Sequence, residues 1–197
     1  MPSPLTVKRN DYHIRPKRSD IYTPPGVARF LFDILGRTLA NTILDPAIGT
    51  GRLTDPWYEA GCRIIGVDTV NRQPRCHSFH LVRYEETERL DRPDLVLCNP
   101  PFNGCAGKRL YPEVFLAHTF RLFGDITPVV LFTPMGFRLN QRRKSTRWRW
   151  LRDTQAKLSS IIALPLDTFP GVEFHAEILV FNVKGVCPHY FLPETAL

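Results

Sequence analysis

The tetrapeptide Asn-Pro-Pro-Phe at 99–102 combines two rigid hydrogen-bond acceptors with an aromatic ring. Asn99 offers a side-chain carbonyl, and Pro100 offers a main-chain carbonyl with no N–H beside it. Because Pro100 and Pro101 fix their φ angles, these acceptors keep their direction without a later entropy cost. Phe102 supplies a face on which a planar heterocycle can stack. We therefore expect this stretch to bind an exocyclic amine on a flat ring.

Such a site would also activate the amine. The lone pair of adenine N6 is delocalised into the ring, so that the amine is a poor nucleophile. Acceptors that bind both of its hydrogens localise the lone pair, aim it at a methyl donor and stabilise the positive charge that develops on nitrogen. A proline-rich turn without function is the simpler interpretation. The stretch directly follows the apolar run 94–98, however, and we therefore favour a catalytic interpretation.

A second turn, Asp-Pro-Ala-Ile-Gly-Thr-Gly at 45–51, indicates a bound small molecule. Gly49 and Gly51 let the backbone approach a ligand closely and accept positive φ angles. The spacing is G-x-G without the third glycine of dinucleotide-binding turns, and no G-K-[ST] of a phosphate-binding loop follows. The turn therefore predicts a ligand without phosphates, with a cationic or amino group near Asp45.

Asp68 ends the next apolar run, 63–68. An acid at the tip of a neighbouring parallel strand is placed to accept hydrogen bonds from both hydroxyls of a ribose. A turn or cap aspartate is the structural alternative. Together with the glycine turn, Asp68 predicts a nucleoside.

The elements that must position these residues follow from the apolar pattern. Continuous rather than alternating runs of Val, Ile and Leu indicate strands that are covered on both faces. Strands are expected at 41–45, 63–68, 94–98, 128–133, 160–165 and 177–183, with a weaker one at 79–83. Helices are expected over about 25–39, 52–61, 111–123 and 143–157. This order predicts a doubly wound, mainly parallel α/β sheet whose ligand lies beyond the carboxyl ends of the strands.

Composition limits the class of protein. The chain has 197 residues and 23% charged residues, with no apolar run of the length that a membrane helix needs. The first 20 residues form a basic arm without the apolar region of a secretory signal. Five scattered cysteines fit a reducing, cytoplasmic compartment. Cys76, His77 and His80 lack a fourth ligand at suitable spacing, and no metal is predicted.

The net charge of +7 favours a polyanionic partner, and its distribution points to one segment. Cations concentrate after the fifth expected strand, with Trp148 and Trp150 between them. They could bind phosphates while the indoles stack on unpaired bases, or the segment could be a solvated helix with a buried Trp. The cations are Arg138, Arg142, Arg143, Lys144, Arg147, Arg149 and Arg152. Lys8, Arg9, Arg15, Lys17 and Arg18 of the N-terminal arm would add a second clamp.

Taken together, these motifs resemble the S-adenosylmethionine-dependent N6-adenine DNA methyltransferases in which the cofactor motif precedes Asn-Pro-Pro-Phe. The matching pieces span residues 22 to 182. The resemblance implies a Rossmann-like class I methyltransferase sheet of seven strands, the last antiparallel. It implies one catalytic domain over 21–197 that acts on a flipped adenine in DNA. No separate target-recognition domain is expected, which leaves room for a separate specificity subunit.

The resemblance also implies roles for individual residues. Asn99, Pro100, Pro101 and Phe102 would form the catalytic motif, and Phe137 would be a second wall of the base pocket. Glu85, with Glu86 as its competitor, would contact the cofactor adenine. The cofactor-binding set would be Tyr22, Thr23, Pro24, Asp45, Ala47, Gly49, Gly51, Asp68, Glu85 and Asn99.

Two other functions remain open at the level of sequence. Related enzymes with the same motif methylate RNA adenine or protein glutamine, and a non-catalytic nucleic-acid-binding module could keep the same scaffold. Phe102 and the Arg/Trp segment favour a nucleic acid, and the intact motifs favour an enzyme. Restriction-modification is one role among several that such an enzyme could have.

Overall fold

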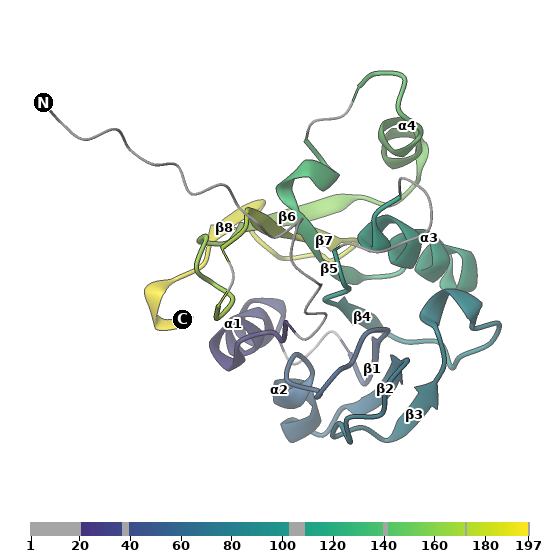
Figure 1. Cartoon of the computed structure of the whole chain (residues 1–197), viewed down its shortest axis with the longest axis vertical. Coiled ribbons are helices and arrows are strands. Elements are labelled where there is room, and N and C mark those ends of the chain that lie inside the picture. The colour runs from purple at the N-terminus through teal and green to yellow at the C-terminus, as the bar shows by residue number, and fades with distance from the viewer. Residues whose placement is uncertain (1–20, 37–39, 103–108, 140–141, 172, 197) are drawn as a thin grey trace, which may run out of the picture.

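A computed structural model of the chain describes residues 21–36, 40–102, 109–139, 142–171 and 173–196. Within these ranges, eight strands form one sheet in the order β3-β2-β1-β4-β5-β7-β6-β8, with helices packed against it (Figure 1). The strands are β1 Thr42–Asp45, β2 Arg63–Asp68, β3 Ser78–Leu81, β4 Leu95–Cys98, β5 Val129–Pro134, β6 Leu158–Ala163, β7 Ala176–Phe181 and β8 His189–Phe191. The α-helices are α1 Pro25–Leu35, α2 Asp55–Glu59, α3 Tyr111–Phe123 and α4 Thr146–Asp153.

The strand directions confirm the predicted mainly parallel sheet. β3, β2, β1, β4 and β5 pair in parallel, whereas β7 runs antiparallel between β5 and β6. The prediction of seven strands is corrected by one, because β8 adds to the edge of the sheet, parallel to β6. The carboxyl ends of β1, β2 and β4 therefore lie along one edge.

Both faces of the sheet are buried, which explains the continuous apolar runs. Ile43 and Leu95 belong to the core cluster under α1 and α2, while Leu44 and Val96 belong to the cluster under α3. Ile43 and Leu44 therefore face opposite sides of the sheet, as do Leu95 and Val96, because successive side chains of a strand point in opposite directions. All four side chains are 0% or 1% exposed.

Three helices, α1, α2 and α4, are shorter than predicted, and glycines follow the ends of α1 and α2. α1 stops before Gly36, whose φ of 73° is left-handed, and α2 is followed by Gly61 at φ 87°. α1 begins at Pro25, in agreement with the prediction, since a proline at the first position loses no hydrogen bond. Among the described residues, no helix has the length and apolar character needed to cross a bilayer. The N-terminal arm, 1–20, lies outside the described residues.

Candidate active site

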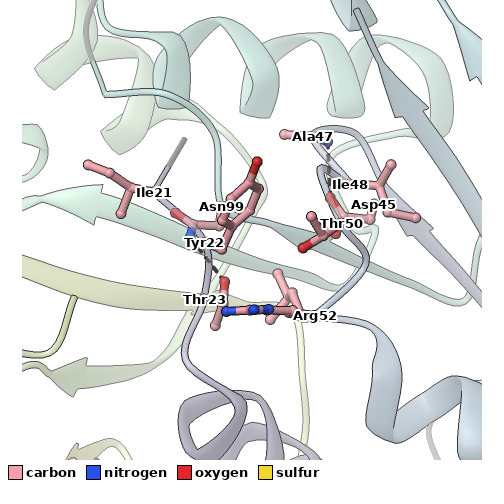
Figure 2. A pocket seen from close by; sticks show the side chains of 10 residues that line it. Ile21, Tyr22, Thr23, Asp45, Ala47, Ile48, Thr50, Arg52 and Asn99 are labelled. Carbon is pink, nitrogen blue, oxygen red and sulfur yellow. Dashed lines mark hydrogen bonds between the residues drawn. The ribbon is translucent and has the colours of Figure 1, made fainter. Parts of the chain in front are cut away.

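A small pocket opens at the carboxyl ends of β1 and β4, where the sequence predicted a ligand (Figure 2). Three segments far apart in the sequence build it: the approach to α1, the turn after β1 and the residue after β4. Of the predicted site residues, Tyr22, Thr23, Asp45, Ala47 and Asn99 line it. Ile21, Ile48, Thr50, Arg52 and Leu53 complete the lining.

Asn99 is held by one end of its amide. Its Nδ2 donates a hydrogen bond to Oγ1 of Thr23, 3.0 Å away, and Thr23 itself is buried (Figure 2). No donor within the described part of the chain bonds to Oδ1 of Asn99. The contact therefore leaves the carbonyl end of the amide, which is the acceptor that the sequence predicted, available at the pocket.

Asp45 is a buried acid with little to stabilise its charge. The side chain is at the tip of β1, and Oδ1 accepts a hydrogen bond from the Ala47 N–H at 3.0 Å. The pKa of Asp45 is raised to about 8: burial is the largest cause, the Ala47 hydrogen bond opposes it, and the charge of Asp68 contributes to the rise. A cation in the pocket would favour the ionised carboxylate.

The glycine turn has the geometry that the sequence predicted. Gly49 and Gly51 have φ angles of 54° and 86°, which a side chain would strain. A Cβ on Gly49 would also lie 3.0 Å from Cε1 of Tyr22, so that glycine allows this ring to approach the turn.

Asp68 lies at the end of β2, as predicted, and its side chain also binds the glycine turn after β1. Its Oδ2 accepts the Gly49 N–H at 2.8 Å, and its Oδ1 accepts the Val70 N–H at 3.0 Å. Asp68 lies outside the pocket lining, and its Oδ1 also forms an ion pair with Arg72 at 3.7 Å. The ribose contact stays a prediction.

Phe102 is not presented to the pocket. The ring is 8% exposed and packs edge-to-face against Phe174, with ring centroids 5.1 Å apart. Phe174 in turn stacks on Phe169 at 5.3 Å. A base that stacks on Phe102 would have to reach a ring that is buried against Phe174. Pro100 and Pro101 also lie outside the pocket lining, as does Pro24.

Phe137 does not lie where the sequence placed it. The side chain is 0% exposed in the core cluster under α3, beneath the guanidinium of Arg147. As a correction, the described aromatic residue beside Phe102 is Phe174, on the connection between β6 and β7. Phe137 is therefore not proposed as a wall of the base pocket.

The two acids that the sequence offered after β3 differ in burial. Glu85 is partly buried in the short helix Tyr84–Glu86, 3.7 Å from Arg83, whereas Glu86 is exposed. Neither lines the pocket, and a contact of Glu85 with the cofactor adenine stays a prediction.

The basic segment divides into two groups. Arg138 makes a bidentate ion pair with Glu177, at 3.1 and 2.8 Å, and Arg147 donates to Glu113 at 2.8 Å. Glu177 and Glu113 are both buried. Arg138 and Arg147 therefore fasten the segment to the core, which corrects their predicted role as phosphate contacts.

The other five cations of the segment face solvent, and one of them, Arg152, pairs with the exposed Asp153 beside it. Arg142, Arg143, Lys144 and Arg149 are exposed, and Trp148 is 42% exposed on α4. Trp150 packs against Phe120 instead. Trp150 therefore packs on the core as in the structural alternative, and base stacking by Trp148 stays a prediction.

Sequence reasoning missed Thr50 and Arg52 at the pocket. Thr50 lies between Gly49 and Gly51, and Arg52 directly follows Gly51. Their place in the glycine turn was the signal that could have identified them as pocket residues. The potential zinc ligands did not assemble: His77 Nδ1 accepts the Ile64 N–H at 3.1 Å. Across the described ranges, no cluster of three or more His, Cys, Asp or Glu side chains could hold a metal ion.

Comparison with known proteins gives structural matches only. No protein-family model and no curated protein sequence matches the chain. A modification subunit of a type I restriction enzyme from Vibrio vulnificus is 20% identical, with a TM-score of 0.68. The match covers 93% of this chain and 49% of the Vibrio protein. An S-adenosylmethionine-dependent class I methyltransferase from Listeria monocytogenes is 15% identical, with a TM-score of 0.66. The match covers 93% of this chain and 69% of the Listeria protein. A Burkholderia thailandensis N1-methyltransferase with bound S-adenosylhomocysteine is 20% identical, with a TM-score of 0.53. The match covers 80% of this chain and 76% of the Burkholderia protein.

The chain has a Rossmann-like class I methyltransferase fold. It spans about half the length of the modification subunit that it matches. At these identities, the comparison establishes the fold, and the chemistry has to be argued from the pocket.

Proposed function

We propose that this protein is an S-adenosylmethionine-dependent methyltransferase that acts on N6 of adenine in DNA. The observation that carries the proposal is the fixed amide of Asn99. Thr23 holds its nitrogen at 3.0 Å, and the oxygen is left to accept a hydrogen from an incoming amine. A rigid acceptor beside a pocket for a cationic ligand is what methyl transfer to an amine requires.

The pocket residues fit the cofactor. Asp45 is a buried carboxyl whose ionised form a cation would stabilise, and Oγ1 of Thr50 is buried without a hydrogen-bond partner among the described residues. Asp45 would hold the amino group, and the turn with Gly49 and Gly51 would pass along the methionine part. Asp68 and Glu85 are proposed for the ribose and the adenine.

The protein's own residues orient the acceptor amine. When bound, S-adenosylmethionine supplies a methyl group on a sulfonium: its C–S bond breaks as the N6–C bond forms, sulfur keeps the electron pair, and the amine releases a proton to solvent. Asn99 Oδ1 and the Pro100 carbonyl would accept the two amine hydrogens. Phe102 would stack on the base after its contact with Phe174 opens.

The exposed cations support a nucleic-acid acceptor. Arg142, Arg143, Lys144 and Arg149 have the charge to neutralise phosphates, and Trp148 has an exposed indole for an unpaired base. An adenine within a duplex cannot reach the pocket, and we propose that it is flipped out. Restriction-modification would be the natural setting, with sequence selection by a separate specificity subunit in the cytoplasm.

One labelling experiment tests the proposed function. The protein is incubated with methyl-labelled S-adenosylmethionine and, in parallel, with DNA, RNA and a protein extract, and the products are hydrolysed and analysed by mass spectrometry. We expect N6-methyladenine in DNA. Label confined to RNA adenine or to glutamine would move the acceptor to those classes, and label in none of them together with no cofactor binding would favour a non-catalytic module.

A further inference from the structure

A carboxyl group and a guanidinium line the same pocket without pairing. Asp45 and Arg52 both belong to the lining, yet no ion pair joins them within the described residues. Asp45 accepts the Ala47 N–H, and the guanidinium of Arg52 lies 5.9 Å from the ring centroid of Tyr22. The pocket therefore holds a carboxyl group, which a cation would ionise, and a guanidinium at separate points.

Thr50 adds a hydroxyl that has no partner. Its Oγ1 is buried and makes no hydrogen bond in the described structure, although it lies in the same lining. Buried hydroxyls are normally satisfied, because an unmade hydrogen bond is costly. A ligand that accepts a hydrogen bond at this point would satisfy Thr50.

The local structure directs Arg52 toward the ligand space. Arg52 directly follows Gly51, whose positive φ turns the chain, and its side chain runs from the turn toward Thr23 in Figure 2. The ring of Tyr22 lies beside the guanidinium and reaches this place because Gly49 has no Cβ. A planar guanidinium beside an aromatic ring is favoured by cation–π attraction and loses less freedom on binding.

We infer that Arg52, assisted by Thr50, recognises the α-carboxylate of an amino-acid ligand whose ammonium group faces Asp45. In the proposed function, on which this inference rests, that ligand end is the methionine part of the cofactor. A guanidinium and a carboxylate form strong charge-assisted hydrogen bonds with a matching planar geometry. Arg52 is then the residue that distinguishes a complete cofactor from a nucleoside that lacks the amino acid.

The test uses two probes that differ only at this end. S-Adenosylhomocysteine carries the amino acid, whereas 5′-methylthioadenosine carries the same nucleoside thioether without it. Isothermal titration calorimetry of the full chain should show tighter binding of S-adenosylhomocysteine. Arg52→Met should weaken that binding about 10- to 100-fold, because a charge-assisted hydrogen bond is removed, and leave 5′-methylthioadenosine unchanged.

Arg75→Met is the matched control. Arg75 lies near the same turn and is also exposed, but it pairs with Glu59 and Asp55 and does not line the pocket. Its removal should change neither affinity. An unchanged melting temperature of Arg52→Met would show that the variant is folded.

The outcomes separate the inference from the proposed function. Unchanged binding of S-adenosylhomocysteine by Arg52→Met, or an equal weakening for both probes, would overturn the role of Arg52 while leaving the cofactor assignment intact. Failure of the wild-type protein to bind either probe would overturn both.

Discussion

The pocket at β1 and β4 differs from the end of β5 in how its polar groups are satisfied. At the end of β5, Glu177 receives two hydrogen bonds from Arg138, and Glu113 receives Arg147 and Arg109 on its two oxygens. In the pocket, the oxygen of Asn99 and the hydroxyl of Thr50 are buried or half-buried with capacity to spare. Satisfied polar groups thus build the scaffold at the end of β5, whereas the pocket keeps hydrogen-bonding capacity for a ligand.

The largest effect is expected from removing the acceptor in the pocket. Asn99→Ala should lower the rate of methyl transfer by at least about 10²- to 10³-fold, because it deletes an aligned group that stabilises developing charge. The affinity for S-adenosylhomocysteine should change by less than about 10-fold. Single-turnover methylation and calorimetry measure the two quantities.

Two further variants sharpen this result. Asn41→Ala removes an exposed amide at the opposite edge of the sheet and should leave the rate unchanged. Thr23→Val should lower the rate less than Asn99→Ala does, and Thr23→Ser should restore it, since Ser keeps the hydroxyl that holds Asn99. Equal rates for Asn99→Ala and wild type would refute the assigned role.

The buried carboxyl of Asp45 gives the next effect, through pH. Its pKa is raised from 3.8 to about 8 in the fold, so that between these values the unfolded chain has lost a proton that the folded chain keeps. This group therefore lowers stability as pH rises, by up to about 1.4 kcal/mol per pH unit, and its effect levels off above pH ~8. The Asp45→Asn variant has no carboxyl group at this position, so its stability lacks this contribution to the pH dependence.

Urea unfolding of the ligand-free protein at several pH values measures this difference. The stability of Asp45→Asn relative to wild type should increase from pH ~5 to pH ~8. A difference that stays flat over this range would show that Asp45 is ionised in the fold. The same variant should bind S-adenosylhomocysteine more weakly, because the carboxylate that pairs with the ammonium group is removed.

At the saturated end, the effect is on stability. Arg138→Met leaves the carboxylate of Glu177, whose side chain is 4% exposed, without its bidentate partner. We expect a decrease of about 3 kcal/mol in the free energy of unfolding. Arg142→Met, which removes an exposed charge, should cost less than about 0.5 kcal/mol. Similar decreases for both variants would remove the distinction between anchored and outward-facing arginines.

The smallest effect per residue is expected at the exposed cations. Replacing Arg142, Arg143 and Lys144 by Gln should weaken DNA binding nearly equally for all sequences. The slope of log affinity against log salt should fall by about 0.9 for each phosphate of duplex DNA that is no longer neutralised. Fluorescence anisotropy at several salt concentrations measures the slope. An unchanged slope would place the DNA elsewhere.

Much of the scaffold could be predicted from the sequence because strands buried on both faces have a local signature. The runs that became β1 and β2 ended on Asp45 and Asp68, Asn99 followed the run that became β4, and parallel pairing brought Asp45 and Asn99 to one edge. β8 has only three residues and partly exposed side chains, which left no pattern to detect.

The site was harder to predict where hydrogen bonds join distant segments. Asn99 and Thr23 are 76 residues apart, and Arg138 and Glu177 are 39 apart. Sequence spacing cannot tell a free arginine from one that is paired with a buried acid. The same limit applies to Phe102, whose packing against Phe174 depends on the connection after β6.

The central claim is that the free oxygen of Asn99 receives the acceptor amine. A crystal structure of the protein with S-adenosylhomocysteine and an adenine-containing DNA tests it most directly. The account predicts the adenine N6 within about 3 Å of Asn99 Oδ1, with Thr23 still bound to Nδ2 and the sulfur facing N6. An adenine held elsewhere, or an Asn99 amide turned so that its oxygen bonds to the protein, would contradict it.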